Sequence, residues 1–154
     1  MAEGITVFCR DATWAQLSDW LDARWPDSRL PATLHWQMPL PNYSISVYDA
    51  DASMQTYEPS ERQAVIRVLG GPPDLAMIVE LRRSRQNEAC DMATELTLAV
   101  MSAFLSVADD EAGKFWTRNE IGRCRDYTGT RFLDVYRHDP AEHRVAPKPP
   151  TEAF

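Results

Sequence analysis

The sequence predicts a single α+β domain in which a mostly antiparallel sheet packs against two main helices, at about residues 13–25 and 87–106. Several short segments alternate apolar and polar residues and are rich in β-formers, whereas these two longer segments repeat apolar residues at helical spacing. A chain of 154 residues with 44% hydrophobic residues has the size of one domain with an ordinary core. We place the domain at residues 1–139 and a Pro-rich mobile tail at residues 140–154.

The first strand and the first helix are marked by local signals. Residues 4–10, GITVFCR, are rich in β-formers and predict a strand. Thr13 and Gln16 have the spacing of a capping box, which predicts a helix start. Pro26 disfavours the helical conformation at the residue before it, so the helix should cover residues 13–25.

A hairpin and a second, shorter helix should follow. Residues 32–38 and 43–49 both predict strands, and the intervening turn composition, PLPN within residues 39–42, favours an antiparallel hairpin. A helix is expected over residues 59–69, because a proline suits its first position and Gly70 can end it.

The second half of the chain should supply the central strand and the longest helix. Residues 75–81, LAMIVEL, are almost continuously apolar and predict the central strand, and residues 87–106 predict the helix. Residues 114–117 form a short extended piece, and residues 117–120 resemble a capping box. Residues 131–137 alternate and predict the last strand.

The charge of the chain restricts its partners. The net charge of -7 disfavours sequence-independent binding to nucleic acid or anionic membranes, which require a basic surface. A basic protein is the natural complement, and a monomer or a homodimer is expected. No apolar run is long enough to span a bilayer, so we expect a cytoplasmic protein. The three widely spaced cysteines predict reduced thiols.

Motifs for catalysis and metal binding are lacking in the sequence, and we predict no catalytic residue, no metal and no cofactor. The three histidines lack zinc-site spacing, and the acidic residues 109–111 lack the alternate-position pattern of a calcium loop. An enzyme of another type remains an alternative. It would be built around Cys9 with His35, or around the pair Asp49 and Asp51.

Two segments combine carboxylates with tryptophan. One is an acidic triplet, expected as a turn after the long helix, and the other lies on the first helix. Exposed aromatic side chains ringed by carboxylates suit a binding surface for a basic protein, although a wide helical face could also bury Trp20 in the core. The candidate partner-binding residues are Asp19, Trp20, Asp22, Asp109, Asp110, Glu111 and Trp116.

The order of these features resembles the small acidic immunity proteins of bacterial polymorphic toxin systems. The resemblance rests on the initial strand and amphipathic helix, the long helix over residues 87–106, and the segment DDEAGKFWTRNEI that follows it. It implies an inhibitor that binds one cognate protein toxin and shields its catalytic or substrate-binding face. The alternative is an acidic secretion chaperone, which would dimerise and hold an unfolded effector segment. A DNA mimic would need longer rows of carboxylates than this chain has.

Overall fold

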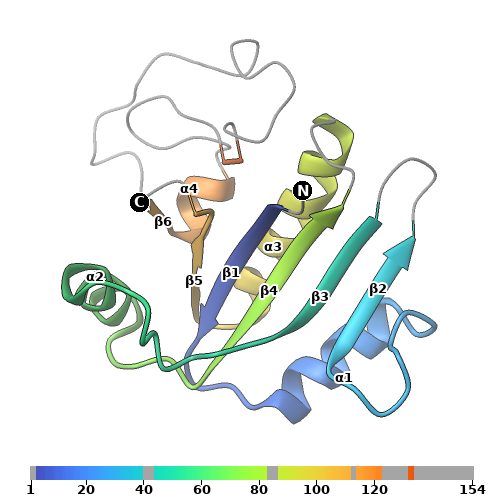
Figure 1. Cartoon of the computed structure of the whole chain (residues 1–154), viewed down its shortest axis with the longest axis horizontal. Coiled ribbons are helices and arrows are strands. Elements are labelled where there is room, and N and C mark those ends of the chain that lie inside the picture. Colours follow the sequence, from blue (N-terminus) through green and yellow to red (C-terminus); the bar gives the residue numbers. More distant parts are fainter. Residues whose placement is uncertain (1–2, 40–43, 83–86, 112–113, 123–131, 134–154) are drawn as a thin grey trace.

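The computed structural model describes residues 3–39, 44–82, 87–111, 114–122 and 132–133, and these form an α+β domain with one six-stranded antiparallel sheet (Figure 1). The strand order is β2-β3-β4-β1-β5-β6. The strands are β1 (Glu3–Cys9), β2 (His35–Pro39), β3 (Ser44–Ala50), β4 (Leu75–Arg82), β5 (Ser106–Asp109) and β6 (Phe115–Trp116). The helices are α1 (Trp14–Arg24), α2 (Pro59–Leu69), α3 (Asn87–Ala103) and α4 (Arg118–Gly122). The predicted fold class is confirmed.

The predicted helix boundaries are confirmed where local chemistry sets them. At the start of α1, the Thr13 hydroxyl accepts from the Gln16 backbone N–H at 3.2 Å, and the Gln16 side chain accepts from the Thr13 N–H at 3.0 Å. This reciprocal pair is the capping box expected from the sequence. Helix α2 ends at Gly70, whose φ of 77° is the left-handed conformation that glycine adopts without a steric penalty.

Strand β4 lies inside the sheet between β3 and β1, which confirms the prediction of a central strand. Its register with both neighbours is continuous, and Val79 pairs with Val47 on one side and Ile5 on the other. All three side chains are fully buried. They belong to the face of the sheet that α1 and α3 cover, and Figure 1 shows α3 behind β1 and β4.

The opposite face has a smaller apolar cluster at one end. Phe8, Ala76 and Val107 lie side by side there and pack against Val65 and Leu69 of α2. Farther along the same face the next row of paired residues is more polar. It consists of His35, Tyr48, Ile78, Thr6 and Asp109. The sheet therefore has one continuous apolar face and one face that is divided between an apolar end and a polar band.

The long helix is shorter than predicted. It ends at Ala103, and Ser106–Asp109 form β5, which pairs with β1 from Cys9 to Thr6. The prediction that the acidic triplet follows the helix directly as a turn is therefore wrong. Backbone pairing to β1, together with burial of Val107, favours a strand over another helical turn.

The predictions for the end of the chain have different outcomes. The short extended piece is confirmed as β6, and the capping box is confirmed by the hydroxyl of Thr117, which accepts from the Glu120 N–H at 3.3 Å. The predicted strand at residues 131–137 and the tail at residues 140–154 lie outside the described residues, apart from two buried turn residues, Phe132 and Leu133. Among the described residues, no helix has the length and apolar character needed to cross a membrane.

Candidate protein-binding face

The acidic triplet and Trp116 are mainly interior groups. Asp109, Asp110 and Trp116 are 8%, 3% and 1% exposed. The Tyr57 hydroxyl donates to Asp109 Oδ2 at 2.6 Å, and the Trp116 indole N–H donates to Asp110 Oδ2 at 2.9 Å. Partner binding through these three side chains would require them to be accessible, but pairing of β5 with β1 and β6 draws them into the fold. Their part in partner binding stays a prediction that burial makes less favourable.

Glu111 is the exposed member of the triplet. Partial burial of its carboxyl group, and the nearby charges of Asp109 and Asp110, raise the pKa of Glu111 above its ordinary value of 4.5. Burial and the hydrogen bond to Asp109 likewise raise the pKa of Tyr57. The folded state therefore disfavours the ionised form of Glu111.

We expect Glu111→Gln to raise the free energy of unfolding at pH 7, by about 0.5 kcal/mol or less because solvent screens this exposed carboxylate. Glu111 binds its proton more tightly in the folded state than in the unfolded state. Its contribution to the stability of the wild-type protein therefore falls as the pH rises from 4.5 through the raised pKa of the folded state. The gain should disappear well below pH 4.5, where both states are protonated. Urea denaturation at several pH values measures this gain in the free energy of unfolding. Asp19→Asn is the control, and an equal gain there would contradict the local explanation.

The residues predicted on the first helix have three different environments. Asp19 is exposed and Trp20 is half-buried. Asp22 is bound within the fold, because its Oδ1 accepts from the Trp36 indole N–H at 2.8 Å and its Oδ2 lies 3.1 Å from Arg29 Nη1. Since Trp36 belongs to the edge strand β2, Asp22 joins α1 to that edge.

The two predicted segments do not form one surface. Asp22 is tied to β2 at one edge of the sheet, whereas Asp110 is tied to Trp116 in β6 at the other edge. All seven candidate residues were predicted from the sequence to bind the same partner. The structure leaves Asp19 and Trp20 as the members of that set that lie on an accessible part of the helical layer.

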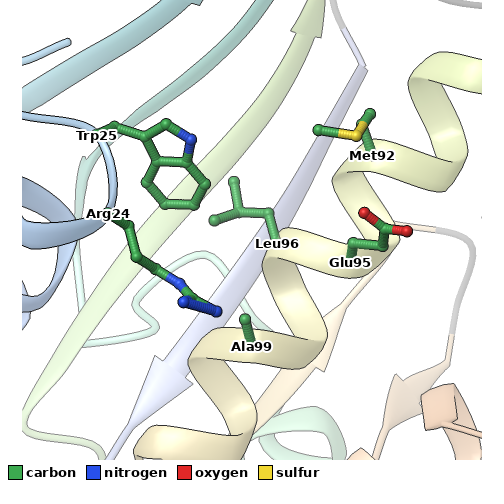
Figure 2. A pocket seen from close by; sticks show the side chains of 6 residues that line it. All are labelled: Arg24, Trp25, Met92, Glu95, Leu96 and Ala99. Carbon is green, nitrogen blue, oxygen red and sulfur yellow. The ribbon is translucent and has the colours of Figure 1, made fainter. Parts of the chain in front are cut away.

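A groove runs between α1 and α3 (Figure 2). In Figure 2, Trp25 and Arg24 lie on one side, and residues of α3 lie on the other. This part has a volume of about 240 Å³. An adjoining hollow of about 460 Å³ shares Arg24, Glu95 and Ala99 with it and extends toward Trp20. We call the two together the helical groove. Its lining residues are Trp20, Arg24, Trp25, Met92, Glu95, Leu96, Leu98, Ala99, Ser102 and Ala103.

Aromatic side chains form one wall of the helical groove. The ring of Trp20 meets Trp25 edge-on at 6.2 Å and Phe104 at 6.3 Å between centroids. The Arg24 guanidinium carbon lies 4.7 Å from the centroid of the Trp20 ring. Trp20 is thus anchored on one side by the core and stays partly accessible on the other, which is the environment of an interface aromatic residue.

The helices that border the helical groove are acidic. They contain five carboxylate residues and a single basic residue, Arg24. Helix α3 has no lysine or arginine, so its charge is wholly negative. Glu88, Asp91 and Glu95 are exposed and recur at the spacing that places side chains on one side of a helix. The five carboxylates are those of Asp19, Asp22, Glu88, Asp91 and Glu95.

The contribution of α3 to this face was not among the residues predicted from the sequence. The signal available was the spacing of its three acidic residues, together with the absence of basic residues from residues 87–103. Trp25 packs against the core, and its ring also borders the groove. Recognising the groove requires knowing that α1 and α3 lie on the same face of the sheet.

Cys9 and His35, considered together for catalysis, are not brought together. Cys9 points to the face that α1 and α3 cover, whereas His35 shares the opposite face with Tyr48. Burial raises the pKa of the Cys9 thiol to about 12, so a thiolate is disfavoured at neutral pH. Asp51 is engaged by Ser53, whose hydroxyl donates to it at 2.6 Å. Within the described parts of the chain, no cluster of three or more metal-ligating side chains occurs.

Comparison with protein-family models, curated proteins and solved structures finds no match for this chain. The helical groove and its acidic border are therefore the features from which a function can be inferred. They combine partly accessible aromatic rings with a predominantly negative charge.

Proposed function

We propose that the chain is an immunity protein that binds a cognate bacterial protein toxin through the helical groove and occludes its active or substrate-binding face. The carrying observation is that partly accessible aromatic rings lie between two helices whose exposed carboxylates outnumber their single guanidinium, that of Arg24. The exposed carboxylates are those of Asp19, Glu88, Asp91 and Glu95. Such a face complements a toxin with a basic surface. The resemblance of the segment at residues 109–121 to immunity proteins supports the same class of protein.

The apolar part of the helical groove would slow the dissociation of the complex with the toxin. Trp20 and Trp25 offer large rings that the core already holds in place, so little side-chain freedom would be lost on binding. Leu98 and Met92 of α3 are half-buried and add apolar area on the other side. Removing these surfaces from water on complex formation would favour the bound state.

The acidic border would act mainly on association and specificity. A predominantly negative field steers a basic partner toward the face and disfavours acidic partners. Asp19 and Glu95 stand on different helices of this border and are both exposed. We place the encounter in the cytoplasm, where an inhibitor would protect the cell from a toxin that acts there.

A growth assay tests the proposal. Cells express the product of the gene adjacent to the one that encodes this chain, either alone or together with this chain. We expect rescue of growth, and a stable complex of the two purified proteins on size-exclusion chromatography. A harmless neighbour, or one that stays toxic in the presence of this chain, would contradict the proposal for that pair. Binding of an unfolded segment of the neighbour without loss of toxicity would favour the secretion chaperone.

Charge neutralisation locates the binding face. We expect Asp19→Asn combined with Glu95→Gln to lower the association rate with the toxin about fivefold at low salt, because two carboxylates that face the basic partner are lost. Stopped-flow kinetics measures the rate, and the difference should shrink as salt rises.

The matched control changes the net charge by the same amount on another part of the molecule. Gln55→Lys combined with Gln63→Lys adds two positive charges at exposed positions, one in the loop before α2 and one on α2. An equal rate loss in this control would mean that net charge alone decides association. An unchanged rate in the Asp19 and Glu95 variant would place the interface away from the helical groove.

A further inference from the structure

The helical groove has an acidic end. The N-terminal half of α3 exposes three carboxylates, those of Glu88, Asp91 and Glu95, and Glu95 also lines both hollows of the groove. Within the described part of the chain, Glu88 and Glu95 form no ion pair with a basic side chain. Their negative charge can therefore attract a basic group of a bound partner.

The other end of the groove is basic. Arg24 and Ser102 line the same hollow, and Arg118 of α4 donates from Nε to the Ser102 hydroxyl at 3.0 Å. In Figure 2 the guanidinium of Arg24 points toward Ala99, and the carboxylate of Glu95 points away from it. Both arginines are exposed, and among the described residues neither guanidinium forms an ion pair with a carboxylate. The charge of the groove thus changes sign along α3.

The walls of the groove favour a helix as the bound segment. They are themselves helices, whose backbone N–H and C=O groups mostly bond within the helix. An extended segment would leave its own N–H and C=O groups without partners against the rings of Trp20 and Trp25. A helix satisfies these groups internally, and the small side chains of Ala99 and Ala103 allow it to approach closely.

The charges of the groove also set the direction of such a helix. Residues 92–103 of α3 line the groove, which corresponds to about 17 Å, or about three helical turns. Acidic residues in the first turn and basic residues in the last turn stabilise a helix. A helix of this kind complements both ends of the groove when its last turns lie beside Glu88 and Glu95. Its first turn then lies beside Arg24 and Arg118.

We propose that the helical groove binds an amphipathic helix of the partner protein that runs antiparallel to α3. This helix has basic residues in its last turns, an acidic residue in its first turn, and an apolar side that packs on Trp20, Trp25 and Leu98. Because it names the part of the partner that the groove would take, this assignment rests on the proposed function.

Two synthetic peptides of about 20 residues test the assignment. They have the same composition and the same stripe of leucines, and a covalent link on the solvent side holds both of them helical. The first peptide has glutamates in its first two turns and lysines in its last two, and the second has these charges exchanged. Fluorescence anisotropy at low salt measures binding to the full chain. We expect a Kd of about 10–100 µM for the first peptide and at least about fivefold weaker binding of the second.

A nitroxide at the C-terminal end of the first peptide reports the direction of the bound helix. We expect it to broaden the backbone NMR signals of Glu88 and Met92 more than those of Ser102 and Ala103, because an antiparallel helix places its C-terminal end beside the N-terminal half of α3. Broadening in the opposite order would contradict the antiparallel arrangement.

Variants of the chain test the charges. Arg24→Gln should weaken binding of the first peptide about threefold. Arg67→Gln is the matched control, because both arginines are exposed in the last turn of an 11-residue helix, and it should leave binding unchanged. Combining Arg24→Glu and Arg118→Glu with Glu88→Lys and Glu95→Lys should reverse the preference between the two peptides. Circular dichroism checks that this variant folds.

Three results would overturn the assignment. They are equal affinity for the two peptides, no binding of either peptide, and equal weakening by Arg24→Gln and Arg67→Gln. The titrations use no toxin, so they fail or succeed independently of the growth test. Rescue of growth without discrimination between the peptides would support the proposed function and exclude a helix of this direction. Selective peptide binding without rescue would support the helix and exclude the neighbouring gene product as the partner.

Discussion

Trp116→Ala is expected to lower the free energy of unfolding by about 3–5 kcal/mol, the range for truncation of a large buried aromatic side chain. The side chain is 1% exposed, and its ring meets Phe132 edge-on at 5.3 Å between centroids. Its truncation also removes the indole N–H that donates to Asp110 Oδ2, a carboxylate that is itself 3% exposed. Urea denaturation followed by circular dichroism measures the loss.

Trp20→Ala is the matched control, because it removes the same side chain from a half-buried position in the helical groove. We expect a smaller loss of stability there, and a weaker complex with the toxin. If Trp116→Ala left stability unchanged and weakened the complex instead, Trp116 would be an accessible binding residue, and the burial of β6 described above would be wrong.

The sequence predicted the elements whose limits are set by neighbouring residues. The capping box of Thr13 and Gln16 fixes the start of α1, and Gly70 fixes the end of α2 through its positive φ. The apolar run at residues 75–81 predicted the central strand because most of its side chains are buried, all except those of Ile78 and Glu80. In these cases the relevant interactions lie within a few residues of one another or follow from the apolar pattern alone.

Strand β5 could not be predicted in this way. Val107 and Ala108 continue the apolar pattern of α3, and only their pairing with Phe8 and Val7 of β1 distinguishes a strand from a further helical turn. That pairing joins distant parts of the chain. The error then extended to the site, because a turn at Asp109 would have been exposed whereas a paired strand is not.

An acidic side chain beside a tryptophan in the sequence does not by itself indicate an exposed binding residue. Asp110 and Asp22 both accept from an indole N–H, one from Trp116 at 2.9 Å and the other from Trp36 at 2.8 Å. A buried tryptophan requires an acceptor for its N–H, and a carboxylate supplies a strong one. A tryptophan and an aspartate in one chain therefore suit an internal bond as well as a binding surface, and only their geometry decides between the two.

Asp22→Ala is expected to lower the free energy of unfolding by about 1–2 kcal/mol, because the Trp36 indole N–H loses a charged acceptor in an interior position. Trp36 is 0% exposed, whereas the Asp22 side chain is 37% exposed, so water can replace part of the lost interaction. Urea denaturation measures the change. Asp19→Ala, on the same helix with an exposed side chain, should change stability by less than about 0.5 kcal/mol.

A double-mutant cycle with Trp36→Phe isolates the bond between Asp22 and Trp36. We expect Asp22→Ala to cost less in the Trp36→Phe background, since phenylalanine has no N–H that needs the carboxylate. Equal losses in both backgrounds would attribute the effect to the ion pair with Arg29, which lies 3.1 Å from Asp22. This cycle also decides how binding data are interpreted. If Asp22 stabilises the fold, weaker toxin binding in an Asp22 variant would reflect a less stable α1, and Asp19 is the residue that reports on the acidic border.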